Sequence, residues 1–176
     1  MLKKITALFA SVCIAAAAIS SFTVTASAEG TNTLSRSTAY GEYKDGWYHI
    51  SNAEQLVALS EESEKTGNPV LTANFVLDND ITLSESYDNQ INIAPNEDSP
   101  FKGVFDGNGH TIFELKHSTY DTDSGLFAFT DGAEIKNLVL ENASIQTVHR
   151  GGLIVGRAIS TKFMNISIRN SDMKII

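Results

Sequence analysis

Cysteine, proline and positive charge are all scarce in this chain. Its single cysteine is Cys13, and the 176 residues include three prolines and 13 lysines and arginines, against 21 aspartates and glutamates. A lone cysteine excludes a disulfide scaffold and a thiolate metal site. The net charge of −8 repels phosphate backbones, so we expect no nucleic acid partner. The four histidines lack the spacing of zinc ligands, and we expect no metal and no cofactor.

The N-terminus has the layout of a secretory signal peptide. Two lysines precede an apolar stretch over 5–19, and the small residues 26–28 supply a cleavage site. Polar residues follow the apolar stretch, so we expect cleavage before Glu29 and no retained membrane span. A lipoprotein is the alternative, but Cys13 lies inside the apolar stretch. We therefore assign residues 1–28 as signal peptide and expect a protein that is secreted, extracellular or at the cell surface.

The segments that follow predict a disordered lead-in over 29–39, and then a hairpin and a capping helix over 40–69. Asp45-Gly46, flanked by aromatic and β-branched residues, is typical of a type I′ turn. The tetrad Ser51-Asn52-Ala53-Glu54 fits a capping box in which the serine is the N-cap. The amphipathic helix that it starts is expected to end near Lys65 and to cover an exposed end of a β core.

From residue 70 onward, short apolar pieces alternate with turn residues and predict an all-β fold. An apolar triplet recurs as Ile112-x-x-Leu115-x-His117, Ile135-x-x-Leu138-x-Leu140 and Phe163-x-x-Ile166-x-Ile168. Asn137 and Asn142 recur as Asn165 and Asn170. A period of this size predicts stacked coils in which inward residues form columns and turn asparagines form ladders. We therefore predict a short parallel β-helix over 70–176 and not a sandwich.

Several of these motifs resemble the GLUG-motif repeats of secreted bacterial surface proteins. They are Gly125-Leu126-Phe127, Gly152-Leu153-Ile154-Val155-Gly156, Ile135-Lys136-Asn137-Leu138 and the run 100–115. The resemblance covers roughly Tyr48 to Asp172 and departs at Ala128, where a second glycine is common. It implies a right-handed parallel β-helix solenoid with no catalytic chemistry of its own, in a bacterial protein of the adhesin type.

The interpretation that we prefer is a non-catalytic module that binds a glycan or a surface-protein ligand. Two alternatives stay open, a polysaccharide lyase or hydrolase on the same scaffold and a structural spacer truncated from a larger surface protein. A hydrolase needs paired carboxylates, and the candidates outside the helix are Asp78, Asp80, Asp106, Asp121, Asp123 and Asp131. Turn capping explains Asp106 as well. The run that starts at Asp121 fails as a calcium loop, because Leu126 stands where glycine is needed.

Four residues are the candidates for ligand binding, and none is assigned as catalytic. Trp47 and Tyr48 belong to an aromatic cluster with Tyr40 and Tyr43, which stacks on sugars if exposed and packs on the capping helix if not. His149 and Arg150 precede two glycines and form the most exposed basic point, where a guanidinium fork suits a carboxylate or a glycan. The strand-like residues before Ile176 predict self-association through an open C-terminal edge.

Overall fold

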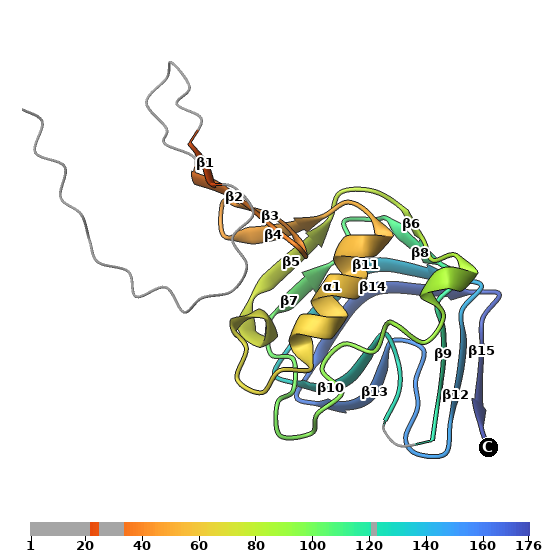
Figure 1. The fold of residues 1–176 in the computed structure, drawn as a ribbon. Helices are drawn as coiled ribbons and strands as arrows, with labels where there is room; N and C mark the ends of the chain where they lie inside the picture. Colours follow the sequence, from red (N-terminus) through yellow and green to blue (C-terminus); the bar gives the residue numbers. More distant parts are fainter. Residues whose placement is uncertain (1–21, 25–33, 121–122) are drawn as a thin grey trace, which may run out of the picture.

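The computed structural model describes residues 22–24, 34–120 and 123–176, with side chains from Thr38 onward. The apolar stretch and cleavage site of the predicted signal peptide lie outside these residues. The described chain is mostly β, with one α-helix, α1 (Ala53–Ser63), and 3₁₀ turns at Pro69–Thr72 and Glu85–Tyr87 (Figure 1).

The strands are short, and most have three to five residues. They are β1 (Phe22–Val24), β2 (Leu34–Thr38), β3 (Gly41–Lys44), β4 (Trp47–Ile50), β5 (Asn74–Leu77), β6 (Ile81–Thr82), β7 (Val104–Asp106), β8 (Thr111–Phe113), β9 (Lys116–Thr119), β10 (Phe127–Asp131), β11 (Glu134–Glu141), β12 (Ser144–Thr147), β13 (Val155–Ile159), β14 (Lys162–Arg169) and β15 (Asp172–Ile175).

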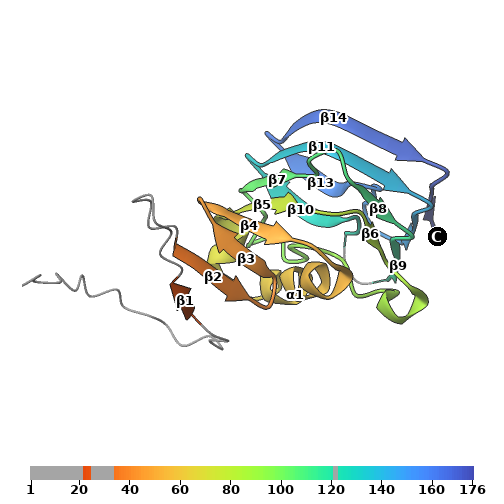
Figure 2. The ribbon, with the colours of Figure 1, turned by 90° about the horizontal axis from the view of Figure 1, so that it is seen from above.

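These strands form three sheets, and the large one is of mixed direction. In it β1 to β4 pair antiparallel, whereas β4, β5, β7, β11 and β14 follow one another in parallel (Figure 2). Strands β6 and β8 extend the same sheet beside β11. The second sheet pairs β10 with β13, and the third holds β9, β12 and β15, all in parallel.

The last two passes of the chain lie in register with each other through all three sheets. Phe127 pairs with Val155, Ile135 with Phe163 and Ile145 with Met173. The chain thus passes through the three sheets twice in the same order, and each residue of the second pass lies beside the residue 28 positions earlier. Asn137 and Asn165 have the same separation. Parallel pairs in one sheet require such returning connections.

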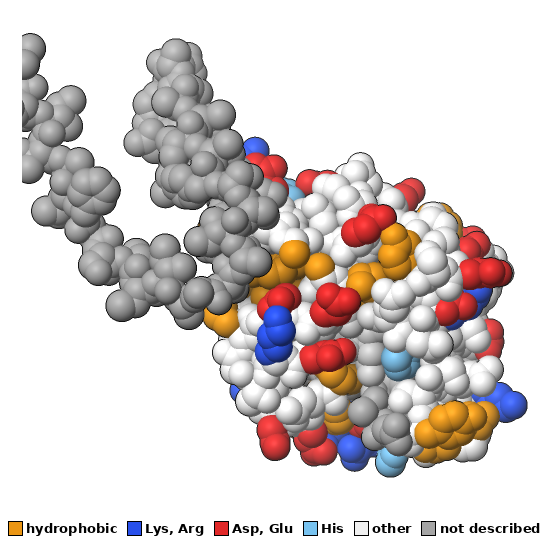
Figure 3. Space-filling view, viewed as in Figure 1, with side chains coloured by type: hydrophobic (Ala, Val, Ile, Leu, Met, Phe, Trp, Pro, Cys, Tyr) orange, Lys and Arg blue, Asp and Glu red, His pale blue; other side chains and the backbone are white. Residues whose placement is uncertain are grey.

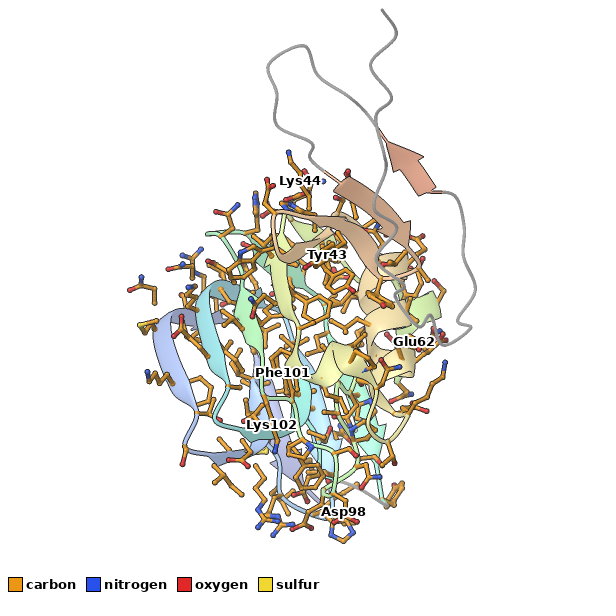
Figure 4. The ribbon with its side chains drawn as sticks, turned by 90° about the vertical axis from the view of Figure 1, so that its left-hand side faces the viewer. Tyr43, Lys44, Glu62, Asp98, Phe101 and Lys102 are labelled. Carbon is orange, nitrogen blue, oxygen red and sulfur yellow. The ribbon has the colours of Figure 1, made fainter. Side chains whose placement is uncertain are left out.

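Large apolar side chains from successive passes fill the space between the sheets. Phe75, Phe101, Phe105 and Phe127 are fully buried, and their ring centroids lie 5.1–6.2 Å apart in successive contacts. Phe101 lies in the interior of the molecule in Figure 4. Each buried ring of this kind contributes about 1.5–3 kcal/mol from its removal from water, so the stacked phenylalanines hold the sheets together.

Of the two predicted asparagine pairs, Asn137 and Asn165 form a ladder at one corner of the large sheet. Asn165 Nδ2 donates to Asn137 Oδ1 at 2.9 Å, and Asn137 Nδ2 donates to Asp106 Oδ1 at 3.0 Å. Both asparagines have a φ of +52°, so each forms a left-handed bend inside its strand. Asparagine tolerates this conformation better than other side chains with a Cβ. The ladder therefore joins three passes of the chain while it satisfies the side chains at the bend.

Helix α1 covers one edge of the core, as predicted. Its residues Leu56 and Leu59 are fully buried. Two of its serines accept hydrogen bonds from backbone N–H groups that a neighbouring strand would otherwise satisfy. Ser60 Oγ accepts from the backbone N–H of Asn92 at 3.0 Å, and Ser63 Oγ accepts from that of Ala94 at 2.8 Å. These hydroxyls satisfy backbone donors that would otherwise be exposed at a sheet edge.

The start of the helix differs from the predicted capping box by one residue. Asn52, not Ser51, is the N-cap, and its Oδ1 accepts from the Gln55 amide at 3.0 Å. Gln55 Oε1 in turn accepts from the Ser51 backbone N–H at 2.7 Å. Asparagine caps as well as serine. The prediction of Ser51 as the N-cap was wrong by one residue, because the side chain that reaches back to the Ser51 N–H is Gln55 and not Glu54.

The lead-in predicted to be disordered over 29–39 is partly a strand. Within its described part, β2 pairs antiparallel with β3 in the register Arg36 to Tyr43. The free edge of the hairpin offers backbone partners to any neighbouring segment, so a small and polar sequence forms a strand here in spite of its composition. The predicted hairpin turn itself fits, because Asp45 and Gly46 both have positive φ.

The first copy of the predicted triplet repeat is out of register. Ile112 pairs with Leu140, and the residue beside Ile135 is Phe105. The cause is a loop that starts at Gly107 and separates β7 from β8, whereas β11 runs unbroken past both of them. The second and third copies pair as the repeat predicts, with Ile135, Leu138 and Leu140 beside Phe163, Ile166 and Ile168.

Candidate functional site

A hollow lined by two of the predicted ligand residues, His149 and Arg150, lies where three loops meet. It has a volume of about 450 Å³ and is lined by Pro95, Asn96, Glu97, Asp123, Phe129, His149 and Arg150. The loop before β10 supplies Asp123, the loop between β12 and β13 supplies His149 and Arg150, and Phe129 forms an almost completely buried floor. We call this hollow the loop pocket.

Arg150 is fixed in the loop pocket by a buried carboxylate. Its Nε lies 2.6 Å from Asp123 Oδ2, and its backbone N–H donates to Asp123 Oδ1 at 3.2 Å. The Asp123 side chain is 3% exposed, whereas that of Arg150 is 58% exposed. Asn92 Nδ2 holds the same turn by donating to the Asp123 carbonyl at 3.1 Å. The guanidinium is thus held from one side and open to solvent on the other.

Glu97 lies between two arginines. Its carboxylate pairs with Arg157 and lies 3.9 Å from Nη2 of Arg150. Arg157 and Glu97 also line a smaller hollow of about 120 Å³, to which Arg150 does not contribute. A ligand carboxylate that takes the place of Glu97 would meet two guanidinium groups, which form strong and directional hydrogen bonds with carboxylates.

The structure brings together one pair of predicted ligand residues, His149 and Arg150, but not the other. Tyr48 stacks on Phe75 at 5.3 Å and contacts Tyr40 and Tyr43 at 5.0 and 4.8 Å. The Trp47 ring lies 5.9 Å from Lys136 Nζ. Tyr40, Tyr43 and Tyr48 therefore pack on one another and on the core residue Phe75, whereas Trp47 lies apart from them beside Lys136.

The aromatic cluster and the loop pocket lie at different ends of the molecule. Tyr43 and Lys44 are the register partners of Tyr48 and Trp47, and Figure 4 shows them at one end of the view, with Asp98, the neighbour of Glu97, at the other. A single ligand site that uses all four predicted residues is excluded by this separation, and only His149 and Arg150 share the hollow.

The described aspartates that were considered for catalysis are all engaged in the structure. Asp106 accepts from the Asn108 amide at 2.8 Å as well as from Asn137. Asp80 accepts from the Thr111 amide at 2.9 Å, and this bond together with His110 lowers the pKa of its carboxyl. Asp78 lies 2.9 Å from His49 Nδ1, and Asp131 lies 3.8 Å from Lys102 Nζ.

Metal binding has no site in the described part of the chain. No three residues from histidine, cysteine, aspartate and glutamate gather there in a group that could hold an ion. Asp121, the first residue of the run that we compared with a calcium loop, lies outside the described residues, and Asp123 is used by Arg150.

Sequence reasoning missed Glu97 and Arg157 as members of the site. Arg157 could have been found from the 28-residue return, because this register places it beside Phe129, the floor of the loop pocket. Glu97 gave no comparable signal, because the loop that carries it has no counterpart in the later passes.

A further hollow of about 210 Å³ lies on the three-stranded sheet. Lys116, His117 and Gln146 line it together with Asp88 and its neighbours. His117 Nδ1 is buried without a hydrogen-bond partner, and burial lowers the pKa of this imidazole. Because its strand pairs His117 with the fully buried Ile145, the histidine occupies an apolar position in the sheet.

Comparison with known proteins gives one partial likeness. Over 122 residues, 65% of its length, the chain is 31% identical to halomucin from Haloquadratum walsbyi, and it spans about 1% of that protein. No protein-family profile matches the chain, and no solved structure matches it. In the described residues no helix is long and apolar enough to cross a membrane.

Proposed function

We propose that this protein is a secreted, non-catalytic interaction module of the bacterial cell surface or extracellular space, and that it binds acidic glycans at the loop pocket. Its scaffold is a short right-handed parallel β-helix with GLUG-like repeats. The parallel return of β13, β14 and β15 beside β10, β11 and β12 supports this scaffold. The likeness to halomucin, which is named as a mucin, supports an extracellular location.

The observation that carries the proposed binding function is the open face of Arg150. The guanidinium is anchored by Asp123 and still 58% exposed, so it loses little freedom when a ligand binds. A uronate-type carboxylate displaces Glu97 and then bridges Arg150 and Arg157, while His149 and Asn96 line the space for sugar hydroxyls. Planar guanidinium groups recognise such carboxylates through paired hydrogen bonds.

The carboxylates of the loop pocket argue against glycoside hydrolysis. A glycosidase needs one carboxyl group that donates a proton and a second that acts as a base or nucleophile. Asp123 accepts from Arg150 through both of its oxygens, and Glu97 is paired with Arg157 and lies close to Arg150. A carboxylate whose oxygens accept from guanidinium groups is not set up to donate a proton.

The remaining alternative, a structural spacer, differs from the binding module because a spacer binds no ligand.

The proposal is tested with the exported chain and a panel of acidic and neutral polysaccharides. Binding is followed by biolayer interferometry, and cleavage is followed by the appearance of new reducing ends. We expect binding to the acidic polysaccharides, weaker binding to their neutral counterparts and no new ends. Absence of binding across the panel favours the spacer, and release of ends from any polysaccharide favours the enzyme.

A pair of arginine variants localises the site. Arg157→Gln removes the guanidinium that pairs with Glu97 beside the loop pocket, and we expect it to weaken binding about tenfold, in line with the loss of a charge-assisted hydrogen bond. Arg169→Gln is the matched control, because this exposed arginine ends β14 and lines neither hollow beside Glu97. Equal binding by the two variants contradicts the proposed site.

A further inference from the structure

Two buried polar atoms without a partner belong to one place, the hollow of about 210 Å³ on the three-stranded sheet. We call it the sheet hollow. Among the described residues, three buried nitrogen or oxygen atoms of side chains lack a hydrogen-bond partner, and two of them, Asp88 Oδ1 and His117 Nδ1, belong to residues that line the sheet hollow. Native proteins leave few buried polar atoms unpaired, and each such atom calls for an explanation. A ligand that completes their surroundings is one.

One wall of the sheet hollow is the outer face of β9 and β12. Along β12, Ser144 and Gln146 alternate with two buried residues, so their side chains point away from the core. Lys116 and Ser118 are their register partners on β9. The Gln146 amide and the Ser118 hydroxyl bond to no described residue. This wall therefore presents donors and acceptors that are open to a ligand.

The second wall is the loop that carries Asp88 and Asn89, and it is fixed to the edge of β9. The Asn89 N–H donates to the Lys116 carbonyl oxygen at 2.9 Å, and Asn89 Oδ1 accepts from the Ser118 N–H at 2.7 Å. These two bonds hold the loop in place as a neighbouring strand would. Both walls are thus set before a ligand arrives, which lowers the entropy lost on binding.

The charges of the sheet hollow offset each other. Lys116 Nζ lies 3.8 Å from Asp88 Oδ2, and burial lowers the pKa of His117, so its imidazole is uncharged at neutral pH. Acidic side chains gather over helix α1, whereas the surface over β9 carries mostly uncharged groups (Figure 3). A charged ligand would have to separate Lys116 from Asp88, whereas a neutral ligand leaves this pair intact. The ligand is therefore expected to be neutral.

We propose that the sheet hollow binds a neutral sugar unit through its hydroxyl groups. A hydroxyl both donates and accepts, so neighbouring hydroxyls of one sugar give the Asp88 carboxylate a donor and the Gln146 amide an acceptor. The Asp88 side chain is 34% exposed, and turning its unpaired Oδ1 toward the sugar breaks no hydrogen bond.

The size and lining of the sheet hollow fit one sugar ring that is held by its edge. Its volume is below the roughly 300–1,000 Å³ of a site for a drug-sized ligand. Among the described residues no phenylalanine, tyrosine or tryptophan lines it, so hydrogen bonds and not stacking hold the ring. The sheet hollow shares no lining residue with the loop pocket. Binding there is therefore independent of the proposed binding of acidic glycans.

The test is a nuclear magnetic resonance titration of the full exported chain with the methyl glycosides of glucose, galactose, mannose and N-acetylglucosamine. The imidazole signals report on each hollow, because His117 lines the sheet hollow and His149 lines the loop pocket. We expect at least one neutral glycoside to shift the His117 signals with a dissociation constant of about 1 mM and to leave those of His149 in place. The methyl glycoside of glucuronic acid, a probe for the loop pocket, should shift His149 and not His117, so each site succeeds or fails by itself.

Two variants localise the binding of the neutral glycoside. Gln146→Leu keeps most of the size of the side chain but removes its amide, and we expect about tenfold weaker binding, because a sugar hydroxyl loses its partner. Ser118→Ala is a smaller change in the same wall and should weaken binding severalfold. Arg157→Gln is the control and should bind as the original chain does, because this arginine does not line the sheet hollow.

Three results would overturn the proposal. The first is no shift of the His117 signals at about 100 mM of any neutral glycoside, which would show that the sheet hollow takes water alone. The second is equal binding by Gln146→Leu, Ser118→Ala and the original chain. The third is a loss of binding in Arg157→Gln that matches the loss in Gln146→Leu.

Discussion

Asn137 links three passes of the chain, and its replacement tests how strongly they are coupled. It donates to Asp106 at 3.0 Å, accepts from Asn165 at 2.9 Å and has a φ of +52°. Asn137→Ala removes both hydrogen bonds and places an ordinary side chain in the left-handed region. Asn137→Gly removes the same hydrogen bonds but accepts the backbone angle.

The structure sets the size of the expected loss. The bond to the Asp106 carboxylate contributes about 1.5–3 kcal/mol and the amide–amide bond about 0.5–1.5 kcal/mol. The left-handed conformation costs alanine a further 1–2 kcal/mol, roughly. We therefore expect Asn137→Ala to lower the free energy of unfolding by about 3–6 kcal/mol. Asn137→Gly should lower it by about 1 kcal/mol less.

Urea denaturation followed by circular dichroism measures these free energies. Asn170→Ala is the control, because Asn170 has a φ of +48° but takes no part in the ladder. It should cost only the backbone contribution of about 1–2 kcal/mol. If Asn137→Gly is as stable as the original chain, the ladder contributes nothing, and the coupling between passes that we infer from it is refuted.

Three further substitutions test other parts of the fold. Burial lowers the pKa of His117, so its contribution to the stability of the fold should be constant above its unfolded pKa of about 6.5 and should fall as the pH drops below that value. Thermal melts of His117→Leu should lack this part of the pH dependence. The same substitution should raise the free energy of unfolding by about 1 kcal/mol, because it removes a buried nitrogen that has no hydrogen-bond partner. Ser63→Ala leaves the Ala94 N–H without its acceptor and should cost about 1–3 kcal/mol in urea denaturation, whereas a loss near zero would show that water replaces the hydroxyl. Gly103→Ala places a Cβ against the carbonyl oxygen of Ala73, and a loss of about 1–3 kcal/mol or more is expected; unchanged stability would contradict this close approach of two passes.

Local chemistry made part of the fold predictable. Asp45-Gly46 favours a hairpin whatever surrounds it, and the buried face of α1 follows from the spacing of its apolar residues. The equal spacing of Asn137 and Asn165 led to the ladder, because strands that return in register place equivalent side chains next to each other. These features depend on residues close in sequence or on a strict period.

The features that failed depend on where the period is broken. The loop that starts at Gly107 lengthens one pass, so Ile112 matched the wrong residues in the triplet alignment. Asp123 and Arg150 each stand two residues before a repeat glycine, Gly125 and Gly152, and the bridge between Ser124 and Gly151 brings them together, but the repeat comparison stopped at the glycines and did not include the residues before them. Trp47 and Tyr48 were grouped with the binding candidates by residue type alone, whereas for Tyr48 the structure uses the ring for packing.

Disulfide trapping tests the central claim, the parallel in-register stacking of the last two passes, most directly. On a Cys13→Ser background, Val139→Cys with Ser167→Cys places the thiols on register partners of β11 and β14. Neighbouring strands lie about 4.8 Å apart, which suits a disulfide, whereas the control pair Val139→Cys with Arg169→Cys is about 8 Å apart along the diagonal. We predict rapid closure of the first pair and none of the second under mild oxidation. Equal closure of both pairs, or closure of the control alone, would contradict the stacking.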